Sequence, residues 1–398
     1  MWSITSAAKE KFRKCHLLPI HESDEDWERA LQEAEEEGED LIGRLKVELE
    51  EVKQELVQVV PSWFIPYVEN GTLNQPTLPK DVREDYLQWM NESSKEFEQV
   101  LDAAFEHTQQ ALPFLSPAVQ DVFMESLHDA TIERMVRDED TLHLYVNTDG
   151  GFSTKSLIHF SFEGVTSEET DTPIEIGQWL IYDELQKTDD GFAFRVLFEC
   201  PDAEWTITAK HIDAEYFYRP KLYTRLRDEE KLEGTSLAEY AAMLNPEYRY
   251  WFITPDVECV ITSLTENIAI ENGSIELGQT EFVVTFGNNR YSYPLSQFNP
   301  IQFVYTDVYE DPYAHFNEPV PEDELEAAAL GDNLELQARA WNTMYANSRE
   351  LKDIINRVLG KIEITDENEM MISVMVSHFY TEGILTEAMV NKFRTVID

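Results

Sequence analysis

The sequence predicts an α+β protein with an N-terminal helical hairpin, two antiparallel β modules and a C-terminal helical bundle. Two observations carry this prediction. Toward both ends of the chain, apolar residues recur every three or four positions, as they do on one face of a helix. In the middle, apolar residues recur at every second position, and turn residues separate the runs, which is typical of antiparallel strands.

The N-terminal hairpin is predicted from two long helical patterns. Residues 22–60 are expected to form one helix, capped by Ser23 and ended by Pro61. Its apolar spacing indicates a buried seam of Ile42, Leu45, Leu49, Val52, Leu56 and Val59. Residues 80–111 form the second helix, and a turn-rich connection lets the two pack side by side. A short helix is expected at 117–126.

The first β module is predicted at 128–213 as one antiparallel sheet of five or six strands. Leu142, Leu144 and Val146 alternate with polar residues and should share one face. Strands are expected at 141–148, 156–162, 174–185, 192–198 and 205–209, with a tight turn at Asp190-Gly191. Four aromatic residues are expected to be mostly buried in its core: either Phe160 or Phe162, together with Trp179, Phe194 and Trp205.

The second β module is expected at about 253–308, after a short helix near 236–244. Its candidate strands are 257–264, 267–271, 280–286, 290–293 and 301–308. Prolines at 312, 319 and 321 suggest a linker. The remaining residues are predicted to form helices at 324–331, 333–359, 366–382 and 386–397. The expected domains are therefore 1–126, 127–215, 216–310 and 311–398.

The charge of the chain restricts its partners. Lys and Arg number 31 against 78 Asp and Glu, which gives a formal net charge of −47. Binding to nucleic acid depends on clustered basic residues, and an anionic membrane surface attracts them as well. We therefore expect neither direct nucleic-acid binding nor membrane association. No apolar run approaches the roughly 18 residues of a transmembrane helix, and no signal peptide is recognisable.

The three cysteines are far apart and odd in number, which indicates a reduced, cytoplasmic environment without a disulfide framework. Cys200 and Cys259 lie in strand-like segments and are expected to be buried and inert. The chain has no CxxC pair, no phosphate-binding loop, no GxGxxG, no GxSxG and no HExxH. No cofactor is therefore predicted, and an enzyme is less favoured than a binding protein.

His128-Asp129 is a weak candidate for a metal site. Metal phosphohydrolases that use such a pair need further His and Asp ligands on neighbouring helices, whereas here a sheet follows. The alternative interpretation is that the pair begins the sheet, with the Asp carboxylate accepting hydrogen bonds from turn amides.

The densest run of charge lies between Glu33 and Asp40. It is interpreted either as a solvated face at the start of a long helix, where acids complement the helix dipole, or as a docking face for a cationic partner. In the second interpretation the binding residues are Glu33, Glu36, Glu37 and Asp40.

Three segments in the middle of the chain resemble a known family: Leu127-His-Asp-Ala-Thr-Ile132, Leu142-His-Leu-Tyr-Val-Asn-Thr-Asp-Gly-Gly-Phe152 and Trp179-Leu-Ile-Tyr-Asp-Glu184. Residues 60–215 are similar to an uncharacterised domain-of-unknown-function family from Bacillus-type bacteria. The opening segment is also similar to that of some bacterial immunity proteins. The resemblance implies a fold but no catalytic residues.

These observations favour a non-enzymatic acidic protein that inhibits or neutralises a protein partner with a basic surface. An immunity protein and a phage anti-defence inhibitor both fit this description, and the partner would then be a toxin, a nuclease or a defence protein. A metal-assisted hydrolase and a structural subunit of a larger assembly remain alternatives. Self-association is expected to use the C-terminal helices.

Overall fold

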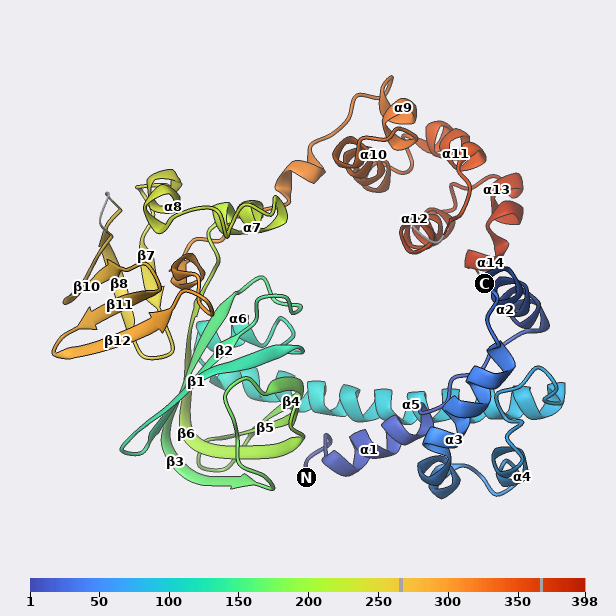
Figure 1. Cartoon of the computed structure of the whole chain (residues 1–398), viewed down its shortest axis with the longest axis horizontal. Coiled ribbons are helices and arrows are strands. Elements are labelled where there is room, and N and C mark those ends of the chain that lie inside the picture. The colour runs from blue at the N-terminus through green and yellow to red at the C-terminus, as the bar shows by residue number, and fades with distance from the viewer. Residues whose placement is uncertain (265–267, 366–367, 398) are drawn as a thin grey trace. The chain divides into compact units, whose positions relative to one another are not determined.

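The computed structural model describes residues 1–264, 268–365 and 368–397. They form two compact units, which are coloured by chain position in Figure 1. The first unit comprises Met1–Arg219 and Asn245–Val308, and the second comprises Pro220–Leu244 and Tyr309–Asp398. N-terminal helices, two antiparallel sheets and C-terminal helices are all present, so the predicted α+β class is confirmed.

The N-terminal region contains five helices: α1 (Ser6–Cys15), α2 (Asp24–Glu37), α3 (Leu41–Val59), α4 (Ile65–Glu69) and α5 (Lys80–Ala111). The prediction of a single helix at 22–60 is wrong. Gly38 ends α2 in a left-handed conformation, with φ of 71°, which a glycine adopts without steric cost. Asp40 then caps α3 by accepting a hydrogen bond from the Gly43 amide.

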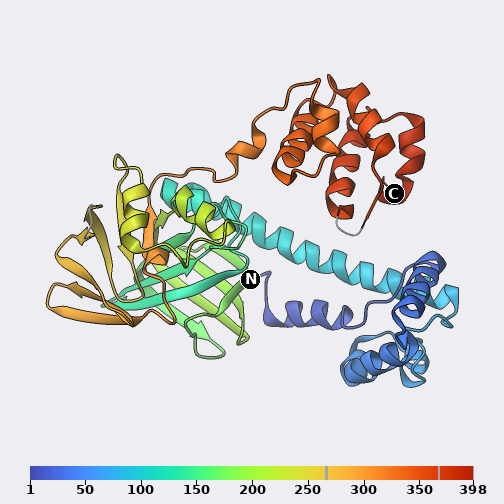
Figure 2. The ribbon, with the colours of Figure 1, turned by 45° about the horizontal axis from the view of Figure 1, so that its top comes forward.

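The predicted seam of α3 does face inward. Leu49 and Leu56 are buried and pack in one core with Phe64, Val68 and Tyr86. The second predicted helix has the expected bounds and becomes the longest element, α5. Figures 1 and 2 both show α5 leaving the N-terminal helices and running on to the first sheet. There it packs against β4, so one helix joins the two parts of the unit.

The first sheet is a closed six-stranded barrel with the order β1-β2-β3-β6-β5-β4. The short helix α6 (Pro117–Val122) precedes it. The strands are β1 (Ala130–Asp138), β2 (Thr141–Asn147), β3 (Leu157–Thr170), β4 (Trp179–Lys187), β5 (Phe192–Glu199) and β6 (Ala203–Phe217). The 174–178 part of the expected third strand is not extended sheet, because β4 begins only at Trp179, two residues after Gly177.

Aromatic side chains fill the barrel, as predicted, with the exception of Trp179. Phe160, Phe162, Phe194 and Trp205 are at most 1% exposed. The prediction for Trp179 is wrong, since this side chain is 47% exposed. The reason is the alternation of β4: Leu180 points into the barrel, and its neighbour therefore points outward.

The second sheet is open and has the order β12-β11-β10-β9-β8-β7-β13. Its strands are β7 (Tyr250–Ile253), β8 (Glu258–Ser263), β9 (Ala269–Ile270), β10 (Gly273–Leu277), β11 (Glu281–Phe286), β12 (Asn289–Pro294) and β13 (Val304–Thr306). Residue 267, where one strand was expected to begin, lies outside the described residues. The expected strand at 301–308 is shorter, because Pro300–Phe303 form a 3-10 turn.

The second sheet rests on the outer surface of the barrel. Tyr145, Leu157 and Phe217 from the barrel share a small core with Ile253 and Tyr305. Just after β6, Tyr218 pairs with Thr306 of β13 through two backbone hydrogen bonds. This joint fixes the outward face of β2, β3 and β6 against the start of β8.

The second unit is helical. Its elements are α7 (Lys221–Asp228), α8 (Leu237–Met243), a 3-10 turn at Ala314–Asn317, α9 (Leu325–Ala329), α10 (Leu334–Ala346), α11 (Lys352–Lys361), α12 (Glu369–Thr381), α13 (Glu387–Lys392) and α14 (Arg394–Ile397). The helix predicted at 333–359 is two helices, because Asn347 ends α10 and its amide group hydrogen-bonds back to Thr343. Residues 366–367 of the predicted third helix lie outside the described residues.

Across the part of the chain that the structure describes, no helix has both the length and the apolar character needed to span a bilayer.

Trp205 provides a test of the barrel core. Its side chain is fully buried among Phe162, Phe194 and Phe198, so Trp205→Ala removes a large volume that the rigid barrel cannot refill. We expect a loss of about 3–5 kcal/mol in the free energy of unfolding. Trp179→Ala is the matched control and should change it by less than about 1 kcal/mol. Urea unfolding followed by circular dichroism measures both, and equal losses would contradict the core assignment.

Candidate functional site

The barrel has a seam between its first and fourth strands. β1 pairs with β4 at Ala130–Leu180 and Thr131–Trp179, and because β1 begins at Ala130, the part of β4 that follows Leu180 has no partner in β1. After Leu180 this edge of β4 is covered by α5. The Thr108 hydroxyl of α5 accepts a hydrogen bond of 3.0 Å from the Leu185 amide of β4. A helix thus replaces a neighbouring strand, and side chains rather than a backbone ladder close the barrel here.

A pocket of about 410 Å³ opens at this seam. Its wall is mostly apolar and includes Leu101, Phe105, Met124 and Tyr182. Phe105 and Met124 are 61% and 70% exposed, so the mouth presents apolar surface to solvent. Two carboxylates, Glu125 and Asp183, and the His128 imidazole also line the pocket, and Glu125 is already paired with Lys155 at 3.0 Å. Apolar walls with few polar groups are typical of small-molecule sites, and the mouths of barrels often hold them.

Asp183 lies on the inward face of β4. Its register partner is Val196, a barrel-core residue, and Leu185 on the same face is fully buried. Burial, followed by repulsion from Glu184, raises the pKa of the Asp183 carboxyl to about 6, against the opposing effect of His128. Within the described chain this carboxylate accepts no hydrogen bond. A half-buried acid that titrates near neutrality is a proton donor and acceptor suited to catalysis.

The neighbouring Glu184 has the opposite environment. It points outward from β4, is fully buried beneath the N-terminal segment, and accepts hydrogen bonds from the Ser3 amide at 2.8 Å and the Ile4 amide at 2.9 Å. The His107 ring nitrogen lies 2.6 Å from its other oxygen. Because all these partners belong to the fold, Glu184 holds the N-terminus and α5 to the barrel, and Asp183 is the acid left available for chemistry.

The predicted pair His128-Asp129 begins the barrel, immediately before β1. The His128 Nδ1 atom lies 3.1 Å from the Asp129 carboxylate, and Asp129 has a φ of 64°. The Asp129 carboxylate therefore faces its neighbouring imidazole, whereas we had expected it to accept hydrogen bonds from turn amides. The structure brings His128 to the seam pocket with Asp183, and leaves Asp129 outside the residues that line it.

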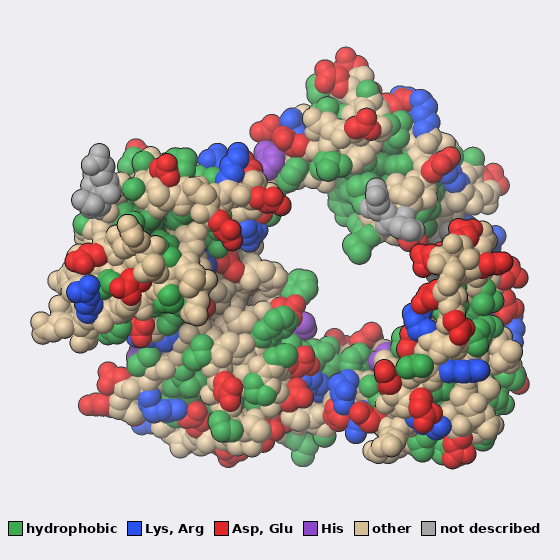
Figure 3. Space-filling model, in the orientation of Figure 1, with side chains coloured by type: hydrophobic (Ala, Val, Ile, Leu, Met, Phe, Trp, Pro, Cys, Tyr) green, Lys and Arg blue, Asp and Glu red, His purple; other side chains and the backbone are tan. Residues whose placement is uncertain are grey.

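The predicted acidic residues Glu33, Glu36, Glu37 and Asp40 are all exposed, and we call them the acidic face. Figure 3 shows acidic side chains gathered over α2 and α3. Glu33, Glu36 and Glu37 are exposed on α2, whose Trp27 and Ala34 are buried. Asp40 lies beyond the helix end, at the cap of α3.

The break at Gly38 changes the electrostatics expected for this run. The acids lie at the C-terminal end of α2, where the helix dipole is negative, and not at the start of a longer helix. The last turn of α2 contains no basic residue. Among the described residues, Glu33, Glu36 and Glu37 form no ion pair. Their arrangement thus costs local stability, typically about 0.3–1 kcal/mol per charge at a helix end.

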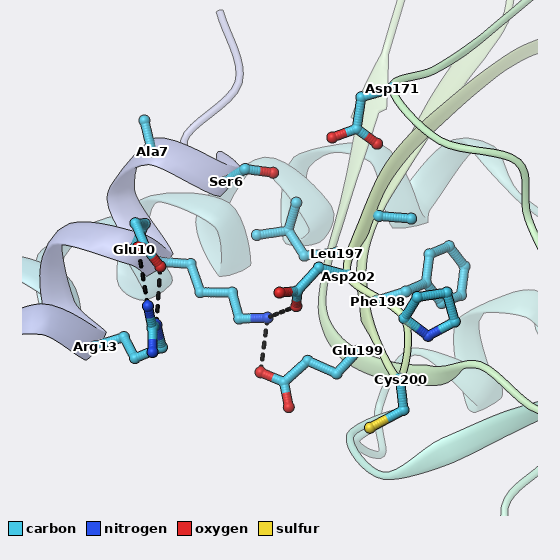
Figure 4. Close-up of a pocket in the computed structure, with 13 residues that line it drawn as sticks. Ser6, Ala7, Glu10, Arg13, Asp171, Leu197, Phe198, Glu199, Cys200 and Asp202 are labelled. Carbon is cyan, nitrogen blue, oxygen red and sulfur yellow. Dashed lines mark hydrogen bonds and ion pairs between the residues drawn. The ribbon is translucent and has the colours of Figure 1, made fainter. Parts of the chain in front are cut away.

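A cleft of about 830 Å³ lies between α1 and the turn from β5 to β6 (Figure 4). Its charged groups pair with one another. The Lys9 ammonium contacts Glu199 at 2.6 Å and Asp202 at 3.1 Å, and Glu10 pairs with Arg13 at 2.8 Å. Cys200 is exposed in this turn, so the prediction that it is buried is wrong. Cys259 is buried as predicted, and burial is the main reason that the pKa of its thiol is raised to about 12. The two ion pairs of Lys9 attach α1 to the barrel, whereas the Glu10–Arg13 pair lies within α1.

The sequence alone did not identify Asp183. Tyr182-Asp183-Glu184 reads as an ordinary polar break in a strand, because the bulge between Leu180 and Tyr182 shifts the alternation. Asp183 stands out only because its partner on β5, Val196, is a core residue. This partner is known only once β4 and β5 are paired, so the spacing of residues in the sequence does not reveal it.

Asp183→Asn should stabilise the protein at neutral pH. Because the folded-state pKa is about 6 against an ordinary 3.8, stability that is full below pH 3.8 is lost as pH rises through 6. The neutral amide avoids this loss, so we expect a gain of about 1–2 kcal/mol at pH 7.5 and none below pH 4. Asp138→Asn, at the exposed end of β1, is the control for removing one charge. Urea unfolding across this pH range measures the effect, and a gain that is independent of pH would contradict the assignment.

Comparison with known proteins identifies one family. A family model described as "Protein of unknown function (DUF4085)" matches residues 6–209. The match begins at α1 and ends within β6, so it covers the N-terminal helices and most of the barrel, and it extends further toward the N-terminus than the 60–215 expected from the sequence. No curated protein and no solved structure matches the chain. Since the model matches more than half of the 398 residues, the chain belongs to the DUF4085 family of proteins of unknown function.

Proposed function

We propose that this protein is a non-enzymatic acidic binding protein that blocks or neutralises a protein partner through the acidic face. The observation that carries the proposal is the position of Glu33, Glu36 and Glu37 at the negative end of α2, where the fold gains nothing from them. Exposed carboxylates that lack ion pairs among the described residues keep their charge available for a cationic surface.

The overall charge supports this choice of partner. At −47 the chain attracts basic proteins over long range and repels nucleic acid. Basic proteins that act on nucleic acid, such as toxins, nucleases and defence proteins, are the class that such a surface suits. An immunity protein and an anti-defence inhibitor are both included in this proposal. Three free cysteines agree with a function in the reducing cytoplasm.

Charge reversal at the acidic face tests the proposal. The fourfold variant Glu33→Lys, Glu36→Lys, Glu37→Lys, Asp40→Lys should lower the association rate with the native partner about tenfold or more at low salt, because electrostatic attraction accelerates encounter. The wild-type rate should itself fall as salt rises, since exposed charges are screened beyond about 8 Å at physiological ionic strength. The measurement is surface plasmon resonance over a salt series, with the partner first captured from the native host and identified by mass spectrometry.

The control variant reverses four exposed acids of α5: Glu84, Asp85, Glu98 and Asp102. It changes the net charge by the same amount, so it separates the acidic face from the general field of the molecule. Equal association rates for the two variants would sink the proposal that binding is local to α2. Both should unfold near the wild-type temperature, because exposed charges contribute little to stability.

The alternative function, a hydrolase, is favoured by the seam pocket. It brings a carboxyl with a pKa of about 6 and an imidazole to one partly apolar cavity. In this proposal Asp183 exchanges the proton with the reacting group and His128 assists at the mouth of the pocket.

A substrate screen tests the alternative. Wild-type protein should hydrolyse at least one member of a panel of nitrophenyl esters, phosphate monoesters and phosphate diesters. Asp183→Asn should lower that rate by about 10²–10⁴-fold, the usual effect of losing a general acid or base. Asp138→Asn should leave it unchanged. Turnover that survives in Asp183→Asn would remove the seam pocket as the active site.

The proposed self-association has separate support in the second unit. Met370 and Val374, one helical turn apart on α12, are 82% and 56% exposed. Exposed apolar pairs of this kind are found at protein interfaces. Self-association through the C-terminal helices therefore stays a prediction for the assembly alternative.

A further inference from the structure

A row of side chains crosses the outer surface of the barrel beneath the second sheet. Tyr145 on β2, His159 on β3 and Glu215 on β6 are successive register partners, so they lie side by side on the outward face. Glu258 at the start of β8 reaches the same point from the second sheet. One donor atom from each of His159, Glu215 and Glu258 lies within 4.8 Å of the other two.

The His159 ring is held firmly. It stacks on the Tyr145 ring, with centroids 4.1 Å apart and planes 8° from parallel. Its Nε2 atom lies 3.0 Å from Nδ1 of His143, a hydrogen-bonding distance. The residue is only 9% exposed. The ring therefore has one nitrogen engaged by a neighbour, and the other, Nδ1, points toward the two carboxylates.

That second nitrogen has no hydrogen-bond partner although it is buried. The nearest oxygens are on Glu215 at 3.6 Å and Glu258 at 4.0 Å, both beyond an effective hydrogen bond. Without a cation, Nδ1 either directs its lone pair at two carboxylates or carries a proton that reaches neither. Both arrangements are unfavourable in a buried site.

The two carboxylates also lack a neutralising group. Arg134 is the nearby cation, but its guanidinium lies over the Tyr145 ring at 4.9 Å. In the described chain Arg134 forms no ion pair with Glu215 or Glu258. The Tyr145 hydroxyl donates a hydrogen bond of 2.6 Å to Glu258, which orients that carboxylate without changing its charge.

We propose that His159, Glu215 and Glu258 form a binding site for a divalent transition-metal ion, of which Zn²⁺ is the best match. One imidazole nitrogen and two carboxylate oxygens suit Zn²⁺, whereas Mg²⁺ and Ca²⁺ prefer oxygen ligands alone. Two ligands of a tetrahedral zinc ion lie about 3.4 Å apart. The distances of 3.6 and 4.0 Å from Nδ1 need only small rotations of the glutamates to reach this value.

The surroundings match the usual support of a metal site. A metal-bound histidine normally has its other ring nitrogen hydrogen-bonded, and His143 provides this contact for His159. The carboxylate ligands of a metal are normally hydrogen-bonded as well, and Tyr145 provides this contact for Glu258. The side chain of Glu215 is 69% exposed, so the ion has a route from solvent. Because the ligands come from β3, β6 and β8, the bound ion connects the second sheet to the barrel. This site is independent of the proposed acidic face and of the seam pocket.

Zinc titration of the full, chelator-treated chain tests the proposal. We expect wild type to bind one Zn²⁺ saturably, measured by calorimetry in excess Mg²⁺ so that diffuse acidic sites are already occupied. Glu215→Gln and Glu258→Gln should each weaken this binding by at least tenfold, and His143→Ala by about tenfold through the lost orientation of His159. Zn²⁺ should raise the melting temperature of wild type and not that of Glu215→Gln.

Glu163→Gln is the matched control. Glu163 is exposed on β3, the strand that carries His159, and its replacement removes one negative charge, as Glu215→Gln does. It should bind Zn²⁺ as wild type does. Glu215 is exposed, so its variant keeps the fold, which the melting curve of the metal-free protein verifies. Equal Zn²⁺ affinity in wild type, Glu215→Gln and Glu258→Gln would overturn the site, as would the absence of saturable binding by wild type in Mg²⁺.

Discussion

The pairing of β3 with β6 is the interaction on which the rest of the first unit depends. The two strands are bonded from Leu157–Phe217 at one end to Thr170–Trp205 at the other. Because side chains alternate along a strand, this one register sends Phe160 and Phe162 into the barrel and His159 and Glu215 to its outer surface. A slip by one residue would exchange the two faces, exposing the aromatic core and burying the acids.

Several buried or nearly buried cations of this acidic chain lie at joints of the fold. Lys155 is 2% exposed and pairs with Glu125 at 3.0 Å. This ion pair attaches the segment between α6 and β1 to the residues just before β3. Lys9 attaches α1 to the β5–β6 turn, and Arg219 pairs with Asp149 where the chain leaves the barrel. A buried cation is stable only when it is paired, so these positions keep their acidic partners. Many of the remaining acids are left in water, and those of α2 form the densest such group.

The three sites considered above all lie where regular structure is interrupted or covered. The seam pocket exists because β1 begins opposite Leu180 and leaves the rest of β4 without a partner strand on that side. The acidic face exists because Gly38 ends α2 beside a run of glutamates. The proposed metal site exists because the second sheet covers an outward row of polar side chains and removes them from solvent. Regular pairing satisfies backbone and side chains alike, and binding capacity arises where that pairing stops.

The sequence by itself determined the α+β class, the bounds of α5, the inward face of β2 and the aromatic core, because these follow from local periodicity and burial of apolar area. It also determined that Glu33, Glu36, Glu37 and Asp40 stay in water. It did not locate the break at Gly38, because a single glycine among good helix formers leaves the apolar pattern intact on both sides. Only the tertiary structure closed the sheet into a barrel, placed Asp183 at the position of a core residue and brought Glu258 to His159. Those outcomes depend on strand register and on contacts between residues a hundred positions apart, and no local spacing encodes them.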